Sequence, residues 1–257
     1  GHLNQLLGRA HNTLYMSRSA RPAGIVTFYR ETYPRIFRET LPCTAAALAL
    51  FLVAMAAGWS ITLHDPAFPG YVLDGRMIDT IERREMWTHG ILAIKPIASS
   101  RITTNNLTVC FTAVAAGITA GLGTAFIMLN NGLLMGVIGA ACWRSGMSLS
   151  LWSFVAPHGA LELPAIFIAG GAGLLLGRAI LFPGRLPRRA ALRHQGGRAV
   201  KLAVGAVPLL LLAGLVEGFV SPTAIPASLK FLIGLTGAGL LGLYLISAGR
   251  IKAGSAP

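Results

Sequence analysis

The sequence predicts an all-α protein, a polytopic bundle of transmembrane helices with an N-terminal amphipathic helix at the membrane interface. Of its 257 residues, 54% are hydrophobic and only 12% are charged, whereas an average soluble domain has about 25% charged residues. The apolar residues form long blocks, and a block of roughly 18 or more is typical of a membrane-spanning helix. The chain has too little polar surface to cover a water-soluble core, so we expect lipid to be its solvent.

Residues 1–40 are predicted to form a basic, cytoplasmic, amphipathic segment. Ile25, Phe28, Tyr29 and Ile36 recur at helical spacing, with arginines between them. A helix with an apolar stripe on one side and bases on the other is typical of the membrane surface. We therefore expect this segment to contact membrane lipids.

Residues 41–252 are predicted to form the bundle, with about six spans. The expected spans cover residues 41–61, 107–129, 132–155, 159–182, 202–220 and 229–248. The third is expected to be irregular, because the apolar run from Leu133 to Trp143 covers only about 17 Å of a core about 30 Å thick. Asn130-Asn131-Gly132 is a strong turn signal. It predicts either a sharp cytoplasmic turn before the third span or a re-entrant element.

The loop 62–103 is predicted to be extracytoplasmic, because its charges balance while the rest of the chain is basic. It contains five acids and five bases, and Met77, Ile78 and Ile81 predict a short amphipathic helix within it. The chain as a whole has a net charge of +13. The unopposed bases lie in the N-terminal segment, in residues 183–201 and at the C-terminus, so the positive-inside rule places all three in the cytoplasm.

Pairs of small residues four positions apart recur in the predicted spans. Three of these pairs are Gly117 and Gly121, Gly132 and Gly136, and Gly173 and Gly177. Such pairs let the backbones of two helices approach closely in lipid. They predict tight packing of the bundle or, alternatively, an interface at which helices slide or gate.

Glu162 and Glu217 are the two acids inside the predicted spans, and acids in lipid are candidates for functional sites. Both are expected near the extracytoplasmic ends of two antiparallel spans, and therefore at a similar depth. His158 precedes Glu162 by four residues, which places both on one face of a helix. We therefore predict an intramembrane polar cluster of His158, Glu162 and Glu217.

Three interpretations of this cluster are open. The first is a hydrogen-bonded network that fixes the packing of two spans. The second is a site for an ion, a proton or a polar substrate in a transporter, channel or permease subunit. The third is a metal site of an intramembrane hydrolase with His158, Glu162 and Glu217 as ligands, although the HExxH spacing of many zinc hydrolases is absent.

Several blocks of the chain resemble the stage II sporulation protein M family. They read LNQLLGRAHNTLY, NNLTVCFTAVAAGITAGLGTAFIMLNNGLLMG, HGALELPAIFIAGGAGLLLG and LVEGFVSP. The resemblance implies a multispanning protein without established catalytic residues, which acts as a scaffold for cell-wall hydrolases at the cytoplasmic membrane. His158, Glu162 and Glu217 fall in the HGxxE and EG blocks of that resemblance. The long basic segment before the first span departs from the sporulation protein and favours a cytoplasmic partner or a lipid surface.

These observations predict a non-enzymatic scaffold in the cytoplasmic membrane, with several crossings and both termini in the cytoplasm. We expect it to bind membrane lipids and other membrane or cell-envelope proteins, and to form homo-oligomers as a further option. We expect no cofactor. No basic run alternates with exposed aromatic residues, so we expect no nucleic acid partner.

Overall fold

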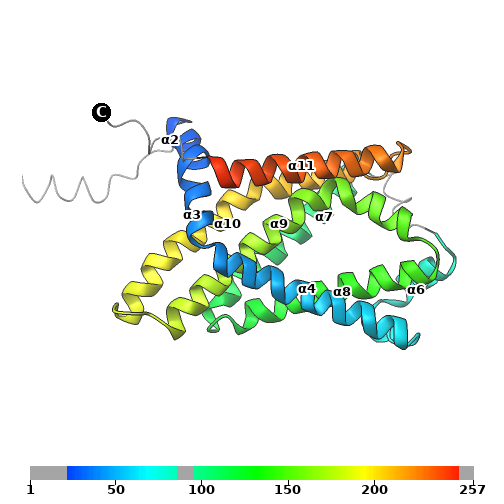
Figure 1. The fold of residues 1–257 in the computed structure, drawn as a ribbon, viewed down its shortest axis with the longest axis horizontal. Helices are drawn as coiled ribbons and strands as arrows, with labels where there is room; N and C mark the ends of the chain where they lie inside the picture. The colour runs from blue at the N-terminus through cyan, green and yellow to red at the C-terminus, as the bar shows by residue number, and fades with distance from the viewer. Residues whose placement is uncertain (1–21, 86–94, 249–257) are drawn as a thin grey trace, which may run out of the picture.

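A computed structural model describes residues 22–85 and 95–248 (Figure 1). Within these stretches every regular element is a helix, which confirms the predicted all-α bundle. The short elements are α2 (Pro22–Thr27), the π-helical turn η1 (Phe28–Thr32), α3 (Tyr33–Glu39), α5 (Pro69–Val72), α6 (Gly75–Glu82) and the 3-10 turn η3 (Ala116–Ile118). The long helices are α4 (Leu41–His64), α7 (Lys95–Ala115), α8 (Leu122–Arg144), α9 (Ser148–Leu181), α10 (Arg188–Phe219) and α11 (Ala227–Ser247).

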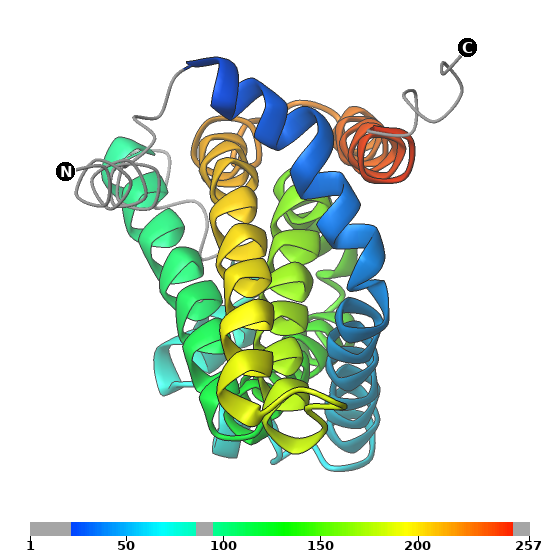
Figure 2. The same cartoon turned by 90° about the vertical axis from the view of Figure 1, so that its left-hand side faces the viewer.

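Helix α9 lies at the centre of the bundle and contacts α4, α7, α8, α10 and α11. In the view along the bundle, α9 and α10 lie between α7 on one side and α4 on the other (Figure 2). Helix α8 packs along α4, whereas α11 lies at the periphery against α9 and α3. The connection between α9 and α10 lies at one end of the bundle, and α6 and the connection between α10 and α11 lie at the other (Figure 1).

Five of the described helices, α4, α8, α9, α10 and α11, are long and apolar enough to cross a membrane. Helix α7 has 21 residues, but its first half is rich in serine, threonine and asparagine. It nevertheless packs along α9 and α10 inside the bundle. The described part of the chain therefore contains six long helices, of which five have the composition of a membrane span.

The turn predicted at Asn130-Asn131-Gly132 is wrong, because these residues lie in the middle of α8. The side-chain amide of Asn131 donates to the backbone carbonyl of Ile127, 2.8 Å away and one turn earlier, so the asparagine is accommodated inside the helix. A Cβ atom at Gly132 would overlap the backbone carbonyl of Phe51 in α4. The glycine therefore serves helix packing rather than chain reversal, and neither a turn nor a re-entrant element is present at this position.

The chain reverses about ten residues earlier, directly after η3. Ala120 and Gly121 have left-handed backbone angles there, with φ of 56° and 85°, and glycine adopts such angles without strain. The apolar run predicted as the span 107–129 is therefore divided between the end of α7 and the start of α8. Likewise, the predicted spans 132–155 and 159–182 are replaced by the remainder of α8 and by α9, a single helix of 34 residues.

The predicted N-terminal helix is present from Pro22 to Glu39, as α2, η1 and α3 in succession, while residues 1–21 lie outside the described part. Its buried face contains Tyr33 and Ile36, which pack against α10 and α11. Ile25, which was predicted to belong to the apolar face, is 52% exposed. The position of this segment at a membrane surface stays a prediction.

The short helix predicted in the loop 62–103 is α6. It begins after Asp74, whose carboxylate accepts a hydrogen bond of 2.8 Å from the backbone amide of Met77, and such a cap stabilises a helix start. Ile81 is buried in a cluster with side chains of α8 and α9. Helix α6 therefore covers the end of the bundle where α8 continues into α9.

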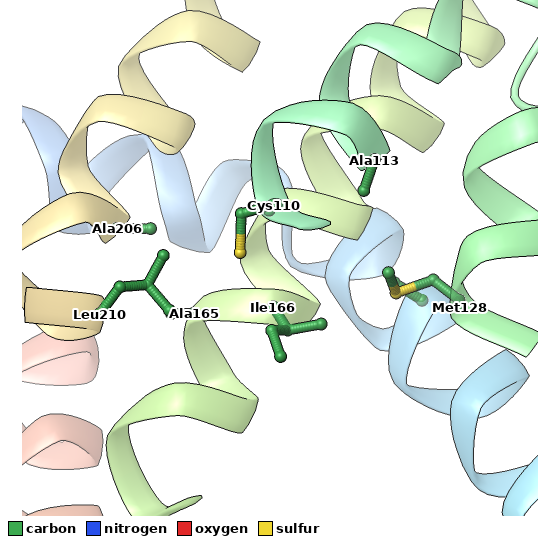
Figure 3. Close-up of a cluster of buried hydrophobic side chains, with 9 residues drawn as sticks. Cys110, Ala113, Met128, Ala165, Ile166, Ala206 and Leu210 are labelled. Carbon is green, nitrogen blue, oxygen red and sulfur yellow. The ribbon is translucent and has the colours of Figure 1, made fainter. Parts of the chain in front are cut away.

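The predicted close packing at the small-residue pairs is confirmed. A Cβ atom at Gly117 would overlap the backbone of Gly173, and one at Gly136 would overlap the carbonyl of Met55. Between these crossings the core is filled by side chains from α7, α8, α9 and α10, among them Cys110, Met128 and Leu210 (Figure 3). Backbone contact at glycines and small side chains together hold α9 in the centre.

Candidate functional site

The three residues predicted to form a polar cluster lie together between α9 and α10. One potential ligand atom from each of His158, Glu162 and Glu217 lies within 4.8 Å of the other two. His158 is 6% exposed and Glu217 is 8% exposed, and Glu162 is half-buried. Two carboxyl groups and an imidazole therefore share one enclosed position among apolar helices.

The shape of α9 places the first two of these residues. His158 and Glu162 are one turn apart, and Pro157 and Pro164 lie inside the same helix. A proline removes one helical hydrogen bond and crowds the preceding turn, so it bends a helix. Helix α9 changes direction in its first half (Figure 1). His158 and Glu162 lie between these two prolines in the sequence, and Glu217 lies in the last turn of α10.

One further polar residue contacts the histidine, and a second holds that residue in turn. The Nδ1 atom of His158 lies 2.9 Å from the hydroxyl oxygen of Ser221, which follows α10 and is fully buried. The ammonium group of Lys230 in α11 donates to the backbone carbonyl of Ser221 at 2.6 Å. On the other side, the ring of Phe154 meets the imidazole edge-on, with ring centroids 5.4 Å apart. The imidazole is therefore fixed in both position and orientation.

Ser221 and Lys230 were not predicted as part of this site. Ser221 directly precedes a proline and lies in the turn that follows α10. The available signal was Lys230, a base one residue inside the apolar segment that begins at Leu229. Because a buried lysine needs a partner, its position pointed to a polar group in a neighbouring helix or connection.

The two carboxyl groups are not satisfied by protein partners. Glu162 Oε2 and Glu217 Oε2 are both buried and have no hydrogen-bond partner among the described residues. Glu217 Oε1 lies 3.9 Å from Nε2 of His158, which is longer than a hydrogen bond. Buried polar atoms without hydrogen-bond partners are unfavourable. The three side chains therefore do not form a hydrogen-bond network in which every polar atom has a partner.

This arrangement can hold a proton, a cation or a small polar ligand. The carboxylate oxygens and the Nε2 atom are all acceptors when the groups are deprotonated. Imidazole and carboxylate are also the ligands that zinc and related metal ions use. Asn130, Asn131 and Gly132 contribute nothing here, because they lie in the middle of α8.

A known protein family matches most of the chain. The family model of stage II sporulation protein M matches residues 47–222. These residues begin inside α4, end at Pro222 and contain the whole cluster and Ser221, whereas Lys230 lies outside them. An uncharacterized protein of Methanocaldococcus jannaschii is 28% identical over 123 residues, which cover 47% of this chain and 69% of that protein. No solved structure matches the chain.

The family match covers more than half of the chain and includes four of the five helices that have the composition of a membrane span. Helices α2, α3 and α11 lie outside the matched residues. The family match and the apolar helices together identify a membrane protein. The chain belongs to the stage II sporulation protein M family.

Proposed function

We propose that this protein is a non-enzymatic scaffold of the cytoplasmic membrane, which binds the transmembrane helices of partner proteins on the outer face of α11. The proposal extends the family membership to a role in recruiting or positioning other proteins. Membrane-anchored proteins of the cell envelope, such as cell-wall hydrolases, are the expected partners. A second copy of this chain is the alternative occupant of the same face.

The observation that carries this proposal is the open outer face of α11. Leu235 is 72% exposed and Leu243 is 65% exposed. Between them, Gly239 and Gly242 have nothing within 4 Å of the position where a Cβ atom would lie. At other helical glycines of this chain, such as Gly117, Gly132 and Gly136, the backbone of a second helix lies in close contact. A glycine face that remains open in the described structure is therefore a place where another helix could approach equally closely.

The charge distribution supports one orientation of the scaffold. Arg185, Arg188, Arg189 and Arg193 are all exposed at the end of the bundle where α9 connects to α10. By the positive-inside rule this end faces the cytoplasm. The opposite end, with α6 and the connection between α10 and α11, would then face outward, toward the cell-wall substrates of the expected partners.

The double substitution Gly239→Leu and Gly242→Leu is expected to reduce partner binding at least tenfold, or by about 1.4 kcal/mol. The two leucines would block close approach without disturbing the fold, because no atom of the described residues lies within 4 Å of either Cβ position. The measurement is quantitative mass spectrometry of proteins that co-purify from native membranes in mild detergent. Gly197→Leu is the matched control, since Gly197 is also helical, exposed and open, but lies on α10.

Partners that are retained equally by the double variant and by the control would contradict a docking site on α11. Recovery of the wild-type protein alone, in repeated purifications, would contradict the scaffold role itself. If the protein that is lost is a second copy of this chain, α11 is a homo-oligomer interface rather than a recruiting surface.

A transporter or permease subunit is the second candidate, because the buried carboxyl oxygens of Glu162 and Glu217 lack protein partners. Transport requires a water-accessible path to this cluster from one side of the membrane. We expect Glu162→Cys, in a variant without the native cysteines, to resist membrane-impermeant thiol reagents applied to either side. Labelling from one side would favour transport over the scaffold.

A further inference from the structure

We propose that His158, Glu162 and Glu217 form a binding site for one divalent metal ion of the zinc class. This inference is independent of the scaffold function and concerns the cluster between α9 and α10. It rests on the donor set, the unsatisfied oxygens and the way in which the imidazole is held. Each of these is a feature that a packing network does not require.

The charges of the three side chains match a divalent cation. Two carboxylates and a neutral imidazole carry a charge of −2, and burying such charge without compensation in an apolar bundle is strongly unfavourable. Lys230 does not supply the compensation, because its hydrogen bond goes to the carbonyl of Ser221, and no ion pair joins it to either glutamate among the described residues. One divalent ion would neutralise both carboxylates.

The distances also suit an ion better than direct hydrogen bonds. At 3.9 Å, Nε2 of His158 and Oε1 of Glu217 are too far apart to bond each other. Two ligands of a tetrahedral zinc ion lie roughly 3.4 Å apart, given bond lengths of about 2.0–2.2 Å. The ligand atoms of all three residues lie within 4.8 Å of one another. Side-chain rotations that move these atoms by about an ångström would bring them into coordination of one ion.

The surroundings of His158 resemble the outer shell of a metal-bound histidine. Its Nδ1 atom is paired with the hydroxyl of Ser221, and this leaves Nε2 directed toward Glu217. In metal sites the second ring nitrogen almost always donates to an oxygen acceptor, which fixes the orientation of the ring, and the hydroxyl oxygen of Ser221 can accept such a bond. Lys230 in turn fixes the backbone of Ser221. Three protein ligands would leave a fourth position open for water, as in catalytic zinc sites.

The test is zinc binding by the full chain, purified in mild detergent with a tag that contains no histidine. After treatment with EDTA, titration with Zn²⁺ is expected to give about one ion per chain by elemental analysis. At a free zinc concentration 100-fold above the Kd, Tm is expected to rise by at least about 5 °C. We expect zinc binding to weaken by more than 100-fold in Glu217→Gln and in His158→Asn. Ser221→Ala removes only the hydroxyl group that contacts His158, and it should weaken zinc binding about 10–100-fold.

Glu82→Gln and His194→Asn are the matched controls, because both residues are exposed and distant in sequence from the cluster. They should bind zinc as the wild type does. The X-ray absorption spectrum of the zinc-loaded wild type should show imidazole and oxygen ligands without sulfur, and this measurement does not depend on whether any variant folds. Sulfur in the coordination shell would assign the metal to a cysteine and overturn the proposal. So would equal zinc affinity in Glu217→Gln and Glu82→Gln, or a wild-type protein whose stoichiometry and Tm do not respond to zinc.

Discussion

A leucine at Gly132 or at Gly136 is expected to destabilise the bundle by about 3 kcal/mol or more, because it would push α8 away from α4. A Cβ atom at either position would overlap a backbone carbonyl of α4, that of Phe51 or that of Met55. A backbone carbonyl cannot rotate away as a side chain can, so the two helices must separate. Their separation would remove contacts along the most extensive helix pair of the bundle.

The measurement is the free energy of unfolding in mixed detergent micelles, obtained by titration with a denaturing detergent. Gly197→Leu is the control for the change of residue type, since a Cβ atom there meets nothing within 4 Å. It should be neutral or slightly stabilising, because leucine favours the helix over glycine by somewhat less than about 1 kcal/mol. If Gly132→Leu and Gly197→Leu unfold at the same denaturant concentration, the close crossing of α4 and α8 is wrong.

The spacing of glycines predicted these crossings because it reports directly on helix packing. Two glycines four residues apart lie on the same face of a helix. In lipid, such a pair allows the backbone of a second helix to contact that face. The same logic predicted the polar cluster. His158 and Glu162 share one face of a span, and Glu217 was expected at the same depth of the antiparallel neighbour. Three polar groups at one depth of two adjacent spans are most readily buried against each other.

The position of the chain reversal could not be predicted from the residues in the same way. The sequence Asn130-Asn131-Gly132 is typical of a turn, but the structure accommodates all three residues inside a helix. Asn131 bonds back to the preceding turn and Gly132 contacts α4. The actual reversal, at Ala120 and Gly121, lies inside an apolar run with no asparagine, proline or charge to mark it. In lipid the apolar pattern extends across such a turn, so hydropathy does not detect it.

Tyr33→Ala is expected to release the N-terminal helix from the bundle, with a local loss of roughly 3–5 kcal/mol, as for other large aromatic residues replaced by alanine. Tyr33 is 1% exposed. Its ring lies against Gly205 of α10, where a Cβ atom would overlap it, and it stacks on Tyr244 of α11 with ring centroids 6.4 Å apart. Hydrogen exchange of residues 22–39, measured in detergent or nanodiscs, should therefore become much faster in the variant. Tyr71→Ala, at a tyrosine that is 83% exposed, should leave the exchange unchanged.

Tyr33→Phe separates the contribution of the ring from that of the hydroxyl group. The hydroxyl oxygen of Tyr33 is buried without a hydrogen-bond partner in the described structure, so its removal should be neutral or stabilising. A loss as large as that of Tyr33→Ala would mean that the hydroxyl is bonded and that the ring does not anchor the helix.

The effect of alanine at Tyr33 should also reach α11, because Arg38 of α3 donates to the carbonyls of Leu245 and Ala248, both at 2.8 Å, at the end of that helix. Terminal carbonyls that lose such a partner allow the last turn to fray. If α11 is the surface on which partners dock, Tyr33→Ala should weaken partner binding without any change on the docking face, whereas Tyr33→Phe should preserve it.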